Sequence, residues 1–214
     1  ELRDLRWKRV SMVFQSAMDA LNPVITVGEQ IVDTMLAHGS TSPAAARARA
    51  GELLEMVGLS GDRLGSFAHQ LSGGMRQRVC IALALALEPA LVILDEPTTA
   101  LDVIVEQEIL EQIRGLQQKL GFAVLFITHD LVRMLQFSDR IAVFYAARLA
   151  EVGTVAGLRG SPRHPYTQGL LRAFPSVHGN SVERVSIPGA PPSLSNPPAG
   201  CRFHPRCAIA VERC

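Results

Sequence analysis

The spacing of apolar residues predicts a series of helices in the first 120 residues. Apolar residues recur at helical spacing over 27–38, and again after Ser42, a candidate helix cap that Pro43 follows. A third helix should open in the stretch LSGGMRQRV, residues 71–79, and a fourth should cover 103–120. The apolar face of the fourth helix would be formed by Ile104, Ile109, Leu110, Ile113, Leu116 and Leu120.

Short apolar runs without helical spacing predict the strands. These runs are 9–15, 91–94 and 122–127, and each is followed or ended by polar residues. Strands that alternate with helices in this way are typical of a parallel sheet covered by helices. We therefore expect an α/β fold, followed by a hairpin over 141–145 and 149–152.

The composition changes after Gly160. Nine of the thirteen prolines lie between Pro162 and Pro205, and three of the four cysteines lie in the last fourteen residues. This composition predicts an extended C-terminal appendage with one short helical piece near 167–173.

Charge and hydropathy argue against two classes of partner. A formal net charge of +1 produces no field that would attract nucleic acid or an anionic membrane surface. The most apolar zone, 79–94, is interrupted by Glu88 and Pro89 and is too short to span a bilayer. The charged start, ELRDLRWKRV, does not read as a secretory signal. Any membrane association is therefore expected through a partner, in a cytosolic setting where disulfides are rare.

Two stretches place polar groups where an anion or a metal could bind. Ser72-Gly73-Gly74 opens a helix, whose unpaired N–H groups and partial positive charge favour a phosphate. The strand in LVILDEP, 91–97, ends in Asp95 and Glu96, where the ligand crevice of a doubly wound sheet lies. Such carboxylates can hold Mg²⁺ through water or polarise an attacking water. The plainer alternatives are a capped helix and a strand that ends in exposed charges.

Three more residues carry weaker signals. His129 follows the strand FAVLFI and could donate a hydrogen bond to a phosphoryl group, although a histidine there is more often structural. Gln15 could bind Mg²⁺ or position water through its amide oxygen, although a surface glutamine is the default. The turn Ala100-Leu101-Asp102 presents an acid before the next helix.

Taken in order, these stretches resemble the motifs of the ATP-binding cassette (ABC) family. Gln15 looks like its Q-loop, LSGGMRQ its signature, LVILDEP its Walker B strand, ALD its D-loop and His129 its H-switch. The resemblance covers roughly 9–153 and implies an ATPase with a P-loop NTPase (RecA-like) core, an ABC helical subdomain and ATP and Mg²⁺ as cofactors.

The same resemblance implies residue roles. Catalysis would rest on Glu96, His129 and Gln15, and Asp95 with Gln15 would hold Mg²⁺. Contacts with nucleotide would come from Ser72, Gly73, Gly74, Gln77, Asp95 and Asp102. The signature residues among these would touch a nucleotide held by a partner cassette, and Asp102 would couple the two sites.

One motif of the family is missing from the sequence. A Walker A loop, G-x-x-x-x-G-K-[ST], should precede the Q-loop, but neither Lys8 nor Lys119 fits it and only fourteen residues precede Gln15. Because Glu96 and His129 are intact, we expect an N-terminally truncated cassette rather than a degenerate subunit. By itself the chain should bind ATP poorly and be inactive, although it could complete a partner's site.

The tail narrows the resemblance to one branch of the family. SPRHPYTQGLL and IPGAPPSLSNPPAGCRFHPRCAIAVERC are similar to the C-terminal extension of dipeptide/oligopeptide and nickel importer ATPases, and residues 12–31 also match that branch. The branch implies an identical or paralogous ATPase partner, two transmembrane permease subunits, and indirectly an external peptide-binding protein. The chain would lie at the cytoplasmic face of the membrane and bind no nucleic acid.

The expected organisation follows from this likeness. Residues 1–17 would end the Q-loop strand of the core, 18–80 form the helical subdomain, 81–159 complete the core, and 160–214 form the extension. The family usually has glycine at the position of Ala147, so the hairpin turn should differ or carry mild strain.

The cysteines of the tail suggest a metal cluster. In the resembled branch this region can carry a 4Fe–4S cluster whose last ligand lies further along the chain. Here Cys201, Cys207 and Cys214 would supply three ligands, with His204 as a candidate fourth. Free thiols are the alternative, and Cys80 is expected to be a buried residue of the signature helix.

Three other functions remain open. An importer of nickel or another small solute would share every motif. A second is a non-transport ABC ATPase. Those of DNA repair carry long coiled coils between the Q-loop and the signature, whereas here only fifty-five residues separate Gln15 from Leu71. Those that act on ribosomes usually carry two cassettes per chain, whereas this chain has one signature. A pure interaction module is supported only by the missing Walker A loop.

Overall fold

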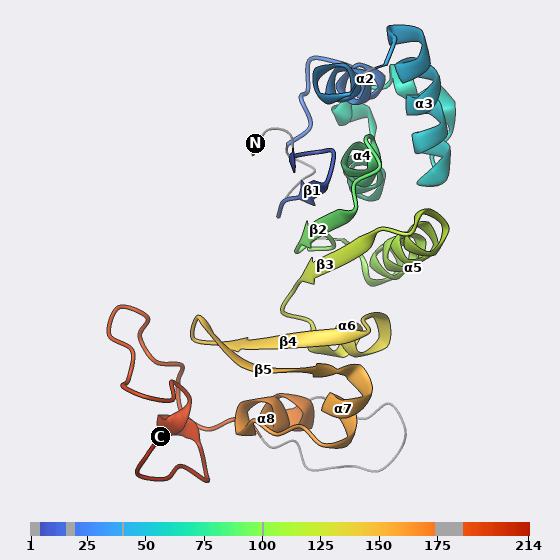
Figure 1. Ribbon diagram of the computed structural model, residues 1–214. Helices are drawn as coiled ribbons and strands as arrows, with labels where there is room; N and C mark the ends of the chain where they lie inside the picture. The colour runs from blue at the N-terminus through green and yellow to red at the C-terminus, as the bar shows by residue number, and fades with distance from the viewer. Residues whose placement is uncertain (1–4, 16–19, 40, 100, 174–185) are drawn as a thin grey trace. The chain divides into compact units, whose positions relative to one another are not determined.

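The chain forms two compact units, Glu1–His129 and Asp130–Cys214, in a computed structural model (Figure 1). The structure describes residues 5–15, 20–39, 41–99, 101–173 and 186–214. None of the helices in these ranges is long and apolar enough to cross a lipid bilayer. The four-part division expected from the sequence stays a prediction.

The first unit contains a parallel three-stranded sheet in the order β1-β2-β3. Its strands are β1 (Val10–Val13), β2 (Leu91–Asp95) and β3 (Ala123–Ile127), which confirms the predicted parallel sheet. Val13 pairs with Leu94, and Asp95 pairs with Ile127. The carboxyl ends of the three strands therefore lie at one edge of the sheet.

Helices α2 and α3, between β1 and β2, begin where local chemistry predicts. Helix α2 (Val27–His38) starts at Thr26, whose hydroxyl accepts a hydrogen bond from the N–H of Glu29, while the Glu29 carboxylate accepts one from the N–H of Thr26. Helix α3 (Pro43–Met56) is capped by the Ser42 side chain, with Pro43 at its first position. Two short 3₁₀ turns, η2 (Gly61–Gly65) and η3 (Ala68–Gln70), lead to the next helix.

Helices α4 (Gly73–Leu85) and α5 (Val103–Leu120) complete the first unit. Helix α4 buries apolar residues on several sides, namely Val79, Cys80, Ile81, Ala82, Ala84 and Leu85. Helix α5 buries one stripe, formed by Ile109, Leu110, Ile113 and Leu116. Its predicted face was too long, because Ile104 and Leu120, near the two ends of the helix, are 74% and 38% exposed.

Strand β3 is more exposed than its continuous apolar run, FAVLFI, would indicate. Its residues alternate between exposed and half-buried, and Leu125 and Ile127 are 49% and 44% exposed. Within the part of the chain that the structure describes, β3 pairs only with β2 and is one of the two edge strands of its sheet. Apolar composition alone does not distinguish an edge strand from a central one.

Among its described residues the second unit contains a hairpin and three short α-helices. Strands β4 (Arg140–Tyr145) and β5 (Arg148–Thr154) are antiparallel, as predicted, and follow helix α6 (Leu131–Phe137). Helices α7 (Val155–Gly160) and α8 (Pro165–Ala173) come next, so the short helix expected near 167–173 is confirmed and begins two residues earlier.

The C-terminal extension is anchored to this hairpin. Phe203 is 4% exposed, and its ring lies 5.1 Å from that of Tyr145 in an edge-on arrangement and 5.5 Å from that of Tyr166. Arg206, at the end of a 3₁₀ turn η4 (His204–Arg206), donates to the Tyr145 hydroxyl and to the carbonyl oxygens of Pro188 and Ile187. Over the described residues 186–214 its regular structure is limited to η4, and Phe203 gives it a place in the core of the unit.

The turn of the hairpin carries the strain that the sequence predicts. Tyr145 pairs with Arg148, which leaves a two-residue loop, and Ala146 and Ala147 both have positive φ, 46° and 61°. A two-residue loop of this kind favours glycine or asparagine, because a Cβ atom crowds the backbone there.

Replacing Ala147 by glycine is expected to stabilise the protein by about 0.5–1 kcal/mol, since the gain in turn geometry exceeds the entropy that glycine adds to the unfolded chain. Urea unfolding measures the change. Ala150→Gly, within β5, is the matched control and should destabilise. Equal destabilisation by both variants would show that the turn is unstrained.

Glu151 joins β5 to the start of α8. Its carboxylate oxygens accept hydrogen bonds from the N–H groups of Arg163, at 2.7 Å, and His164, at 3.0 Å. Burial by itself would raise the pKa of Glu151, but these hydrogen bonds outweigh burial and hold the pKa below its ordinary value.

A lowered pKa in the folded state predicts an acid-sensitive contribution to stability. This contribution is complete above the pKa of the unfolded carboxyl and is lost as the pH falls through the lower folded pKa. Glu151→Gln should cost about 1 kcal/mol at neutral pH, because the carboxylate is only half-buried, and less in acid. Urea unfolding at pH 7 and pH 3 tests this. A difference between the two proteins that stays constant with pH would contradict it.

Candidate active site

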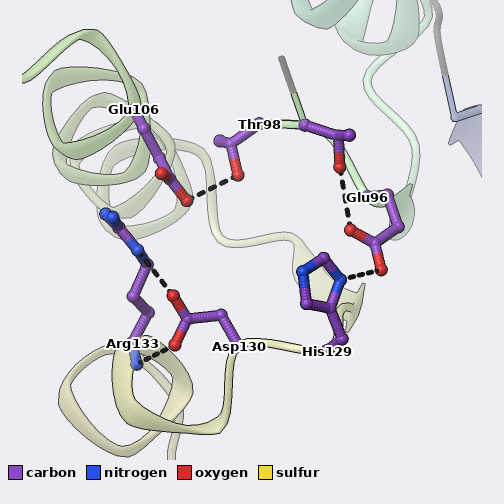
Figure 2. Close-up of polar contacts among 7 residues, drawn as sticks. Glu96, Thr98, Glu106, His129, Asp130 and Arg133 are labelled. Carbon is purple, nitrogen blue, oxygen red and sulfur yellow. Dashed lines mark hydrogen bonds and ion pairs between the residues drawn. The ribbon is translucent and has the colours of Figure 1, made fainter. Parts of the chain in front are cut away.

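Glu96 and His129 are brought together at the carboxyl edge of the first sheet (Figure 2). Glu96 directly follows β2 and His129 lies two residues after β3, so the parallel pairing of these strands sets the two side chains beside each other. The backbone N–H of Glu96 donates to the carbonyl oxygen of Ile127 at 2.9 Å. His129 Nδ1 lies 2.8 Å from Glu96 Oε1.

The Glu96 carboxylate is held in one orientation. The hydroxyl of Thr99 donates to its second oxygen, Oε2, at 2.8 Å. Burial by itself would raise the pKa of Glu96, but the hydrogen bonds from His129 and Thr99 lower it below its ordinary value. An ionised carboxylate can only accept, so the proton shared with His129 lies on Nδ1.

The backbone at Glu96 lies in a sparsely populated region. Its φ is 47°, which a non-glycine residue adopts only at a cost. The turn from β2 to α5 is held by further hydrogen bonds, from Thr98 Oγ1 to Glu106 Oε1 at 2.7 Å and from the N–H of Leu101 to the carbonyl of Thr98 at 3.2 Å. A strained residue within such a network is typical of a functional site.

Asp102 begins helix α5 without capping it. Its carbonyl accepts the N–H of Glu106, but its carboxylate makes no capping hydrogen bond to the helix. The side chain is exposed, which fits the predicted contact with another subunit. Ala100, of the same motif, lies outside the described residues.

The start of α4 has the geometry expected of an anion-binding helix tip. Ser72 is exposed, and its hydroxyl accepts the N–H of Met75 at 3.3 Å. The other N–H groups of the first turn have no partner within the helix, which is the feature that favours an anion at such a position. Gln77 does not fit the predicted nucleotide contact, since it is 2% exposed and lies on the inward side of α4. Its position in the signature motif gave no warning of this burial.

Asp95 and Gln15 fit the chemistry of a magnesium site. Asp95 ends β2, and Gln15 is exposed two residues after β1, so both lie at the carboxyl edge of the sheet. Carboxylate and amide oxygens are ligands that Mg²⁺ accepts. The described residues contain no group of three or more histidine, cysteine, aspartate or glutamate side chains placed to hold a metal ion. Water and nucleotide oxygens are further ligands that Mg²⁺ accepts at such a site.

The predicted iron–sulfur ligands are not gathered in this way. Cys201, Cys207 and Cys214 are free thiols, and with His204 they form no metal-binding group among the residues with a described placement. The N–H of Cys201 does donate to the carbonyl of Cys214, so the backbone of the segment folds back on itself. The cluster hypothesis is not supported. Burial raises the pKa of Cys80 to about 12, which fits the inert buried thiol that the sequence predicts.

Two residues of the site, Thr99 and Glu106, have no signal in the sequence that marks them as functional. Thr99 orients Glu96, and Glu106 holds Thr98, but threonines and glutamates are common on such turns and helices. Only the distances in the folded chain distinguish these two from their neighbours.

Family models match both ends of the chain. One is described as "ABC transporter" and matches residues 2–99. The other is described as "Oligopeptide/dipeptide transporter, C-terminal region" and matches residues 150–214. The first model covers the Q-loop, signature and Walker B positions and the second covers the tail, while residues 100–149, which include Asp102 and His129, lie outside both.

Two curated relatives come from Bacillus subtilis strain 168. The chain is 47% identical over 216 residues to the dipeptide transport ATP-binding protein DppD, covering 100% of this chain and 64% of the relative. It is 46% identical over 215 residues to the oligopeptide transport ATP-binding protein OppD, covering 99% of this chain and 60% of the relative. The chain therefore spans less than two thirds of the length of these relatives.

A solved structure shares the fold. It is a dimeric ATP-binding cassette in a post-hydrolysis state bound to ADP and phosphate, with a TM-score of 0.62 and 31% sequence identity. The similarity covers 72% of this chain and 66% of that one.

Proposed function

This chain belongs to the ABC transporter family, and we propose that the complete protein is the ATPase subunit that energises import of dipeptides or oligopeptides. The observation that carries the proposal is the oriented Glu96 carboxylate, joined to His129 and Thr99 at the carboxyl edge of a parallel sheet. The likeness of the tail to peptide-transport relatives supports the choice of cargo.

In the proposed reaction water attacks the γ-phosphorus of ATP. The bond from that phosphorus to the oxygen bridging to the β-phosphate breaks, and ADP and phosphate leave. Glu96 orients the water and takes up its proton, while His129 and Thr99 keep the carboxylate in place. Mg²⁺ bound with the nucleotide would neutralise phosphate charge, and Asp95 and Gln15 are the residues that would hold it.

The α4 tip and Asp102 serve a second subunit in this proposal. The tip at Ser72-Gly73-Gly74, where Ser72 is exposed, presents N–H groups to a nucleotide held by a partner cassette. The exposed Asp102 carboxylate, which makes no capping hydrogen bond to its own helix, reaches the same interface. The partner would be an identical or paralogous cassette. Two transmembrane permease subunits, and through them an external peptide-binding protein, complete the assembly at the cytoplasmic face of the membrane.

Reconstitution of the complete protein with its permeases in proteoliposomes tests this function. We expect ATP-dependent uptake of a labelled dipeptide or oligopeptide, stimulated by the external binding protein. Uptake of Ni²⁺ without uptake of peptide would replace the cargo and leave the ATPase role intact. An assembly that hydrolyses no ATP with either solute would refute the role itself.

A further inference from the structure

Helices α4 and α5 touch through two consecutive turns. On the first turn of α4, a Cβ atom added to Gly74 would lie 2.7 Å from Cγ1 of Val105. Real Cβ atoms essentially never approach another atom so closely. Val105 lies on the first turn of α5 and cannot easily move away, because a β-branched side chain in a helix has one strongly preferred rotamer. The space beside Val105 therefore admits no side chain at position 74.

Arg78, one turn further along α4, reaches the same helix. Its NH1 donates to Gln112 Oε1 at 2.8 Å and to the carbonyl of Val57 at 3.2 Å, and its NH2 donates to Glu108 Oε2 at 3.1 Å. The Glu108 side chain is 59% exposed, so the ion pair itself contributes little to stability. The rigid, planar guanidinium of Arg78 instead fixes the positions of the helices relative to one another, because it is hydrogen-bonded to α5 and to the end of α3 at the same time.

We propose that Gly74 and Arg78 join α4 and α5 into one rigid lever, so that the Ser72 tip and Asp102 move together. Gly74 lies two residues after Ser72, and Val105 lies three residues after Asp102, so the contact joins the two functional tips almost directly. Gly74 has to be glycine because of Val105 in its own chain, whatever a nucleotide on the partner requires. Val105 and Arg78 are positioning residues, and the lever rests on the proposed function for its role in hydrolysis.

Enlarging the side chain at position 74 and shrinking the one at position 105 tests the contact. In the complete, assembled protein Gly74→Ala should lower kcat about tenfold while KM for ATP stays within about twofold, because the tip is misplaced rather than removed. Val105→Ala removes the clashing methyl group and should restore kcat to within about threefold in the double variant. Gly73→Ala is the matched comparison, and Val105→Ala should not restore it.

The outcomes separate the lever from the proposed function. Thermal unfolding of the same variants tests the contact between Gly74 and Val105 independently of ATP hydrolysis. The stability that Gly74→Ala loses should be recovered when Val105→Ala is added. Normal kcat in Gly74→Ala, or no recovery in the double variant, would overturn the lever while hydrolysis by the unsubstituted protein leaves the ATPase role in place. No hydrolysis by the unsubstituted protein, with stability still recovered, would overturn the ATPase role alone.

A second variant guards against misfolding of Val105→Ala. Arg78→Lys keeps the charge but loses the fork that holds Gln112 and Glu108 together. We expect kcat to fall about fivefold with KM for ATP unchanged, as for loss of an interaction felt only in the transition state. An unchanged kcat in Arg78→Lys would equally refute the lever.

Discussion

Replacing Glu96 by glutamine is expected to leave ATP binding intact and to lower hydrolysis about a hundredfold to ten-thousandfold in the complete, assembled protein. The amide has the shape of the carboxylate: its oxygen can accept the hydrogen bond from His129, and its NH2 group can donate to the Thr99 hydroxyl, which then accepts instead of donating. The turn should therefore keep its shape. What the amide cannot do is take up the proton of the attacking water. The measurement is phosphate release at saturating ATP, with binding of a fluorescent ATP analogue measured in parallel.

Glu111→Gln is the matched control for this experiment. It makes the same chemical change on an exposed position of α5, where the side chain meets only the amide of Gln107 in the described contacts. Its turnover should equal that of the unsubstituted protein. Near-normal turnover in Glu96→Gln would remove Glu96 from catalysis and leave Asp95 as the remaining acid at the end of β2.

Replacing Leu94 by alanine should cost about 3 kcal/mol of unfolding free energy. Leu94 is 1% exposed on β2, the central strand of the described sheet, directly before Asp95 and Glu96. The substitution leaves a cavity that the paired strands β1 and β3 prevent from collapsing. Urea unfolding followed by circular dichroism gives the change from the shift in midpoint.

Leu120→Ala is the control for burial. It removes the same atoms at the end of α5, where the side chain is 38% exposed, and should cost less than about 1 kcal/mol. An equal loss in the two variants would mean that Leu94 is not part of a tightly packed core.

The positions of the site residues were predictable where they follow from the order of strands along the chain. Asp95, Glu96, Gln15 and His129 each follow or end a short apolar run, and parallel strands bring such positions to one edge. The pairing of Glu96 with His129 is a consequence of that rule and of the register of Asp95 with Ile127. The burial of Gln77 could not be predicted, because a polar residue in an apolar helix can face either side.

Local signals in the sequence determined where elements begin and end. Thr26, Ser42 and Ser72 cap helices through their own side chains, and Gly121 ends α5 with a φ of 75°. These interactions span at most four residues, so they act in any context and can be read in order along the chain. Composition likewise marked the extended tail, since proline cannot donate to a helix or a sheet.

Tertiary structure alone decided which of these residues meet. The fit of Gly74 against Val105, the hydrogen bonds of Arg78 and the packing of Phe203 on Tyr145 have no local signal. Their partners are separated by 21 or more residues and meet only through packing. The edge position of β3 is of the same kind, since exposure depends on which strands lie next to it. The periodicity of a sequence indicates which face of its own helix or strand a residue occupies. The distance from that residue to residues on other elements is set only when the helices and strands pack together.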